Sequence, residues 1–219
     1  MQFKVLLVMD EKEKDYLQDL TEIRSMMEKS SRFISLSGLA GVFAGIFALA
    51  GSILAHYIIK NFYIDIWFEN DIIQLSKDLV LHLFLVAMAV LLLSLFFGYY
   101  FTTKKAKKLG HKTWNKTSQL MLINLAIPLF AGGIFCVSLF LRDQLGLIAP
   151  TTLIFYGLAL VNGSKFTLKD IKYLGYCEMI VGLIATFFIG WGLWFWAFGF
   201  GILHIVYGIS MYFKYEHKQ

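Results

Sequence analysis

The sequence predicts an all-α fold: a polytopic membrane bundle of six transmembrane helices, preceded by a cytoplasmic amphipathic helix. Composition is the first observation, because 58% of the 219 residues are hydrophobic and 16% are charged, whereas soluble domains have roughly 45–50% and about 25%. The second is that apolar residues cluster in nearly uncharged stretches of about 20 residues, the length that a helix needs to cross a bilayer. The third is that basic and acidic loops alternate between these stretches. Together they exclude a soluble globular domain and a disordered chain.

Residues 1–32 form a charged segment that we expect on the cytoplasmic side of the membrane. Within residues 10–32, apolar side chains recur at steps of three and four residues, which is typical of an amphipathic helix. These side chains are Leu17, Leu20, Ile23 and Met27. Two roles are open for this helix. It packs on the cytoplasmic side of the bundle, or it binds a membrane surface or a partner protein.

A six-helix transmembrane domain is predicted over residues 33–213, followed by a cytoplasmic tail at 214–219. Each span is an apolar run whose length suits a membrane helix. The predicted spans are 33–59, 79–101, 120–141, 145–161, 173–189 and 191–213. Only Gly190 and Gly192 separate the last two spans, so that division has the least support in the sequence.

The loops predict the orientation. Residues 102–117 contain six lysines and no acidic residue, whereas residues 60–78 contain four acidic residues and two lysines. Lysine-rich loops of membrane proteins stay in the cytoplasm. An even number of spans places both termini on one side, and the basic loops make that side the cytoplasm.

The net charge of +5 follows from these basic loops and does not indicate a nucleic-acid partner. We expect the lipid bilayer as the main partner. The sequence lacks the GxSxG, GxGxxG, HExxH and CxxCH motifs and the P-loop. It therefore identifies no catalytic residue, and we predict no cofactor.

A stripe of small residues in the first span predicts close helix packing. Gly38, Gly41 and Gly45 lie on one face, and Gly41 and Gly45 form a GxxxG pattern. Glycine lets two helix backbones approach closely in lipid. The partner of this face is a helix of the same chain or, alternatively, the same span of a second copy in a homodimer.

A polar kink is predicted in the third span. Pro128 has no N–H, so the carbonyl of Asn124 loses its helical hydrogen bond. The interpretation that we favour is a bent helix without a cavity. The alternative is that the kink and the amide line a polar cavity.

Two histidines are weak candidates for metal ligands. His56 lies near the outer end of the first span and His82 near the outer start of the second. Adjacent antiparallel helices would bring them together, but two histidines make only half of a metal site. We therefore predict no metal site, and the simpler interpretation is two interfacial histidines with ordinary hydrogen bonds.

The best candidate for a polar site is an intramembrane pair, Glu178 and His204. Glu178 is the only acidic residue well inside a predicted span, where an ionisable group is costly and favours a functional role. Each residue lies about 12–13 positions from the turn at 190–191, so a rise of 1.5 Å per residue places both roughly 18–20 Å from the turn. Small residues share a helix face with each, and such faces pack against other helices.

We therefore expect both side chains to point into the bundle, paired directly or through a water, Tyr207 or another polar group. The pair is either a clamp that fixes helix packing or a proton-linked or ligand-binding site. A third outcome, that the two side chains do not meet, is also open.

Two stretches resemble a known family. Residues 27–41, MEKSSRFISLSGLAG, are similar to the beginning of the first span in a family of uncharacterised six-span bacterial inner-membrane proteins, and residues 198–209, FGFGILHIVYGI, resemble its last span. The resemblance covers residues from about 16 to the end of the chain and implies a location in the bacterial inner membrane. Members sometimes carry the name β-carotene monooxygenase. The propeller-type carotenoid oxygenases are all-β proteins with four histidine ligands, which an all-helical chain does not match.

The sequence leaves the function open between three hypotheses. The leading one is a non-enzymatic inner-membrane protein that acts through partners, as a regulator or an assembly factor. The second is a transporter or binder of a small lipophilic molecule, suggested by the kinked third span. The third is a metal-dependent membrane oxidoreductase that uses His56 and His82.

Overall fold

The computed structural model describes residues 33–68, 77–110 and 112–217. The amphipathic helix predicted within residues 10–32 lies outside the described residues. The described chain is helical. Its elements are α2 (Gly38–Phe68), α3 (Lys77–Lys108), α4 (Lys116–Leu141), η1 (Leu145–Leu147), α5 (Ile148–Gly163), η2 (Ser164–Phe166), α6 (Asp170–Ala185), α7 (Gly192–Trp196), the π-helix η3 (Ala197–Leu203) and α8 (His204–Tyr215).

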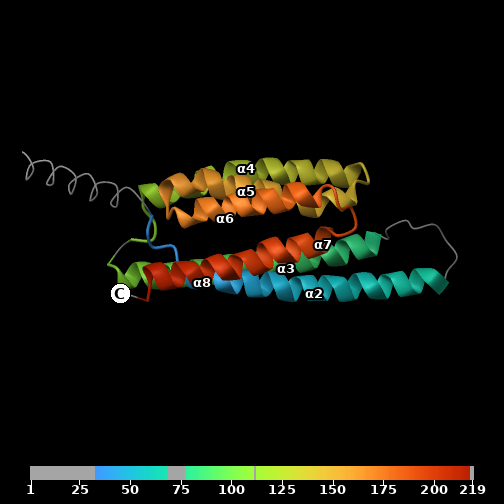
Figure 1. The fold of residues 1–219 in the computed structure, drawn as a ribbon, viewed down its shortest axis with the longest axis horizontal. Helices are drawn as coiled ribbons and strands as arrows, with labels where there is room; N and C mark the ends of the chain where they lie inside the picture. The colour runs from blue at the N-terminus through green and yellow to red at the C-terminus, as the bar shows by residue number, and fades with distance from the viewer. Residues whose placement is uncertain (1–32, 69–76, 111, 218–219) are drawn as a thin grey trace, which may run out of the picture.

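The helices form two groups that lie side by side along their length (Figure 1). In one group α5 packs between α4 and α6. In the other, α2 packs between α3 and a continuous C-terminal helix, which is the name we use for α7, η3 and α8 together. The two groups meet where α5 contacts α7 and where α6 contacts all three parts of the C-terminal helix. This meeting surface carries the candidate site.

Five stretches of the described chain are long and apolar enough to cross a membrane: Gly38–Asn61, Leu79–Lys108, Lys116–Leu141, Leu145–Phe166 and Gly192–Tyr215. They correspond to the predicted spans one to four and six. The α-helix α6 has 16 residues, about 24 Å at 1.5 Å per residue, which is short of a hydrocarbon core of roughly 30 Å. Beyond Ala185 the chain continues in turns. The described chain is thus all-α with five membrane-length helices, and the predicted fifth span, over α6, stays a prediction.

The glycine stripe of α2 contacts the C-terminal helix of the same chain. A Cβ atom at Gly38 would come within 2.5 Å of the Gly208 carbonyl oxygen, and one at Gly45 within 2.6 Å of the Gly201 carbonyl oxygen. Gly41 lies between them, against the backbone of Gly208. Backbones this close leave no room for a side chain. A homodimer through the same stripe would have to displace α8.

One end of the bundle carries the lysines of the last turn of α3, and we call it the basic end. At this end a polar clamp joins residue Glu216 to the start of α2. The Glu216 carboxylate accepts hydrogen bonds from the Gly38 N–H (2.6 Å) and the Ser37 hydroxyl (3.2 Å). Lys105 Nζ lies 3.4 Å from the same carboxylate and donates to the Leu36 carbonyl (2.7 Å). A carboxylate here satisfies a free N–H at the helix N-terminus and complements the positive end of its dipole.

Hydrogen bonds also connect the two helix groups at the basic end. The Phe33 N–H donates to the Phe166 carbonyl, and the Thr167 hydroxyl donates to the Phe33 carbonyl, each over 2.7 Å. At the start of α6, Asp170 accepts hydrogen bonds from Tyr215 (2.5 Å) and Lys214 (3.0 Å). Each of these hydrogen bonds links a residue of one group to a residue of the other.

Candidate functional site

A carboxylate from one helix group meets an imidazole from the other at the centre of the candidate site. Glu178 lies on the buried face of α6 and its side chain is 0% exposed. His204 is the first residue of α8 and is 6% exposed. The His204 Nδ1 atom lies 3.2 Å from Glu178 Oε1. The sequence places both residues at one depth, and the structure brings their side chains together.

Besides Glu178, the imidazole of His204 has one further polar partner at each of its two nitrogens. Its Nε2 atom lies 2.9 Å from the hydroxyl of Tyr156 on α5, and its Nδ1 atom lies 3.1 Å from the Gly199 carbonyl oxygen. Because Nδ1 faces a carbonyl and a carboxylate, both acceptors, this nitrogen carries a proton unless Glu178 itself holds one. In the neutral imidazole Nε2 then accepts from the Tyr156 hydroxyl. Glu178, His204 and Tyr156 thus form a continuous polar chain across the two groups.

The Glu178 carboxylate is short of hydrogen bonds. The contact with His204 Nδ1 has the distance of an ion pair, but the Nδ1–H bond meets hydrogen-bond geometry with the Gly199 carbonyl rather than with Oε1. Within the described structure neither carboxylate oxygen has a hydrogen-bond donor, although both are buried. A buried ionised carboxylate without donors is costly.

A π-helical segment positions these groups. The hydrogen-bond pattern of η3 is π-helical from Ala197 to Leu203, directly before His204. Segments of π-helix are rare in proteins, and those that occur are often located at functional sites. Two glycines, Gly199 and Gly201, are its buried residues. A Cβ atom at Gly199 would lie 2.5 Å from Glu178 Oε2, so glycine is what lets the carboxylate reach the backbone of η3.

Close contacts between α5 and α6 hold Glu178 and Tyr156 on their side of the site. A Cβ atom at Gly157 would come within 2.6 Å of the Gly175 carbonyl oxygen, and one at Gly175 within 2.7 Å of the Gly157 carbonyl oxygen. These two helices therefore touch backbone to backbone, one residue from Tyr156 and one helical turn from Glu178. The small residues that share a face with Glu178 pack against α5.

Aromatic rings cover the polar chain on the side away from the basic end. The Phe200 ring lies 5.0 Å from the Tyr156 ring and 5.9 Å from the imidazole of His204, centroid to centroid. The Trp196 ring follows at 4.9 Å from Phe200. Leu153, which is 0% exposed, lies beside Gly199 and the carboxylate. The site is therefore polar along one line and apolar around it, which strengthens electrostatic interactions between its members.

Tyr156 is the member that the sequence analysis missed, and Tyr207 is not the bridging group. The Tyr207 hydroxyl lies 3.5 Å from the Cys177 sulfur, one residue before Glu178 but on another face of α6. Tyr156 lies within an apolar run of the sequence and is uncharged, so the sequence does not distinguish it from its apolar neighbours. A tyrosine hydroxyl in the interior of a membrane span needs a partner, and that requirement was the available signal.

The kink candidate has a structural partner. The helix α4 continues through Pro128 from Lys116 to Leu141. The side chain of Asn162, on α5, donates to the Asn124 carbonyl over 2.8 Å, so the acceptor that Pro128 leaves free is satisfied from the neighbouring helix. The Asn124 side chain in turn donates to the Leu120 carbonyl.

The two weak metal candidates lie elsewhere. The His56 ring packs against Trp194, 5.6 Å between centroids, and His82 is an exposed residue of α3. In the described parts of the chain, no three His, Cys, Asp or Glu side chains lie close enough together to hold a metal ion.

Comparisons with protein-family models, with curated proteins and with solved structures find no match for this chain. The geometry of the site is therefore what bears on function.

Proposed function

We propose that the chain is a six-span protein of the bacterial inner membrane, with both termini in the cytoplasm, that binds and releases a proton at Glu178 and His204, with Tyr156 as the hydrogen-bond partner of the imidazole. We further propose that this protonation drives a movement of the two helix groups that carries a small molecule across the membrane. This is the transporter hypothesis, now attached to a specific site. The family resemblance and the lysine distribution support the location and the orientation.

The observation that carries the proposal is the Glu178 carboxylate, which is fully buried, has no hydrogen-bond donor among the described residues and faces His204 across the boundary between the two groups. Ionisable residues inside membrane spans are rare and mark proton or substrate pathways. A carboxylate that served only to fix packing would be expected to have its hydrogen bonds satisfied.

The site suits a proton-linked movement because its members belong to different groups. Glu178 and Tyr156 lie on α6 and α5, whereas His204 lies on α8. A carboxylate facing an imidazolium attracts it strongly in apolar surroundings. A second proton, on Glu178, removes this attraction, and so does loss of the proton that charges His204. Movement of one set of helices against another around a central site is common in transporters.

The protonation step is tested by infrared difference spectroscopy on the purified protein. Acidification should produce the carbonyl band of a buried carboxylic acid, and Glu178→Gln should lack that band. Asp143→Asn is the matched control, because Asp143 is an exposed turn residue with φ 55°, a conformation that asparagine tolerates. A band that persists in Glu178→Gln contradicts the proposal.

The movement is tested with spin labels at two exposed positions, one in each group. Leu183 on α6 and Leu54 on α2 are 53% and 49% exposed and are replaced by cysteine after the native Cys136 and Cys177 have been removed. We expect the distance between the labels to change with pH in the parent protein and to stay constant in Glu178→Gln. A distance between the labels that does not change with pH in the parent protein would refute the coupling.

Topology is tested by fusing a reporter that is active only outside the cytoplasm. The six-span arrangement predicts activity after Glu69 and none after Lys108 or at Gln219. If α6 does not cross the membrane, the fusions after Lys108 and at Gln219 lie on opposite sides and differ in activity. This experiment therefore decides directly whether α6, the predicted fifth span, crosses the membrane.

A second candidate function is the regulator or assembly factor that acts through a protein partner. Its support is α3, which packs against α2. Only 6% of the most apolar 18-residue stretch of α3 is buried inside the described protein. A photocrosslinker at Leu92, which is 59% exposed, tests it in native membranes, with Leu122 on α4 as the control position. Reproducible capture of one protein from Leu92 alone supports the partner hypothesis, and recovery of the uncrosslinked protein contradicts it.

A further inference from the structure

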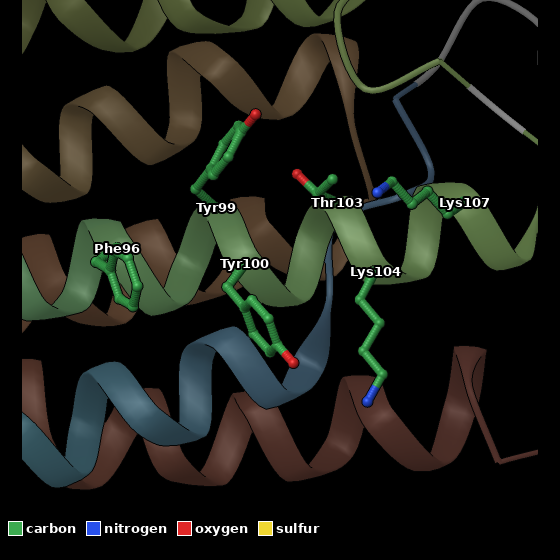
Figure 2. A pocket seen from close by; sticks show the side chains of 6 residues that line it. All are labelled: Phe96, Tyr99, Tyr100, Thr103, Lys104 and Lys107. Carbon is green, nitrogen blue, oxygen red and sulfur yellow. The ribbon is translucent and has the colours of Figure 1, made fainter.

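The basic end of α3 carries a groove between two parallel ridges of side chains. Residues four apart on a helix lie above one another. Figure 2 shows the ridge Tyr99, Thr103 and Lys107 on one side and the ridge Tyr100 and Lys104 on the other, with Phe96 at the beginning of the groove. The hollow between them is lined by these six residues. Each ridge runs from an aromatic ring to an ammonium group.

This groove faces away from the rest of the protein. The opposite face of α3 packs on α2 through phenylalanines, with the rings of Phe97 and Phe43 stacked at 5.5 Å. By contrast, Tyr99 and Tyr100 are 69% and 52% exposed. In a membrane-spanning α3 the groove therefore opens toward lipid.

The two lysines of the groove have no carboxylate partner within the described parts of the chain, where the ion pairs of lysine are those of Lys105 and Lys214. Lys105 lies between them in the sequence but is buried and bonds to Leu36 and Glu216. Lys104 and Lys107 are exposed. The two ammonium groups, one on each side of the groove, therefore carry uncompensated positive charge that an anion complements.

We propose that this groove binds one anionic phospholipid, with its phosphate between Lys104 and Lys107 and an acyl chain along Phe96, Tyr99 and Tyr100. The order along the groove, from aromatic rings to ammonium groups, matches the order from acyl chain to phosphate. Thr103 lines the groove between them, although its hydroxyl oxygen is itself buried. Basic juxtamembrane sites of this kind bind anionic headgroups, and tyrosines favour the interface.

This inference is independent of the proton-binding site, which lies in other helices. The test is native mass spectrometry of the full-length protein in detergent, titrated with phosphatidylglycerol. Each lysine near an anionic headgroup contributes about fivefold in affinity. Replacing both, Lys104→Gln and Lys107→Gln, should weaken phosphatidylglycerol binding about 25-fold, whereas the conservative pair Lys104→Arg and Lys107→Arg should retain it.

Two controls separate this site from general charge. Lys116→Gln with Lys169→Gln removes the same charge from two exposed lysines outside the groove and should leave the affinity unchanged. Phosphatidylcholine should bind much more weakly than phosphatidylglycerol, and soluble glycerol phosphate should compete poorly because it lacks acyl chains. Equal weakening by both lysine pairs, equal binding of the two lipids, or competition by glycerol phosphate as effective as by the lipid would each overturn the proposal.

Discussion

Gly199 lies directly against the carboxylate of Glu178: a Cβ atom at this glycine would stand 2.5 Å from Oε2 and equally close to Leu153 Cδ2. The π-helical segment and the buried acid therefore fit each other at a position where any added side chain must displace the Glu178 carboxylate and the Leu153 side chain. This contact makes the site sensitive to the smallest possible enlargement.

We expect Gly199→Ala to destabilise the protein by about 1–3 kcal/mol, since an overpacked core has to shift side chains or backbone. Thermal unfolding in detergent measures the effect. Gly133→Ala is the matched control, because a Cβ atom there meets nothing within 4 Å and alanine is about 1 kcal/mol better than glycine in a helix interior. Equal melting temperatures for the two variants would contradict the packing described here.

Tyr156→Phe removes the hydroxyl that bonds to His204 Nε2 and leaves a buried nitrogen without a partner. We expect a loss of about 1–3 kcal/mol in the free energy of unfolding. Tyr173→Phe, at a tyrosine that is 58% exposed, should change the stability little. In Tyr156→Phe, the infrared band of the protonated Glu178 side chain should also appear at a different pH. A purely structural role for Tyr156 does not produce this change.

The hydrogen bond from Asn162 to the Asn124 carbonyl should matter only while Pro128 is present. Asn162→Ala alone should cost about 1 kcal/mol, because the carbonyl is left without a donor. Pro128→Ala supplies a backbone N–H to the same carbonyl, so the cost of Asn162→Ala should fall in that background. A double-mutant cycle measures the coupling, and additive effects would show that the two donors do not substitute for each other.

Asp170, at the basic end, predicts a pH dependence of stability. Burial raises the pKa of its carboxyl, but hydrogen bonds from Tyr215 and Lys214 outweigh burial and hold the pKa below its usual value. A carboxyl whose pKa is lowered on folding stabilises the protein above its unfolded pKa of about 3.9, and this contribution disappears as the pH falls through the folded pKa. The melting temperatures of the parent protein and Asp170→Asn should therefore differ at pH 6 and converge on acidification. A constant difference would contradict this assignment.

The pairing of Glu178 with His204 was predictable because it depends on how many residues separate each of them from the turn at 190–191. A hairpin and a constant rise per residue fix depth, and small residues on one face indicate which side of a helix meets another. The position of Tyr156 was not predictable in this way. It depends on the rotation of α5 against α6, which the contact between Gly157 and Gly175 sets. The π-helical hydrogen bonding of η3 has no comparable signature, since the same glycines are compatible with an ordinary α-helix.

The number of spans shows a similar division. The five long apolar helices follow from composition and length, which the sequence contains. The remaining one, the predicted fifth span, depends on where the hydrogen bonding of α6 ends. The apolar run extends to Ile189, but the α-helix ends at Ala185, because the chain turns toward the C-terminal helix before the apolar residues are exhausted.

The clamp between Glu216 and the start of α2 has a consequence for the order in which the protein is made. A ribosome delivers α2 to the membrane long before it reaches residue 216, so α2 first lies there without the carboxylate that caps Gly38 and without the helix that covers the glycine stripe. Both become available only after Glu216 has left the ribosome. Chains that stop before α8 would leave α2 uncapped and its glycine face open to quality-control proteases, and chains altered at Glu216 would leave α2 uncapped.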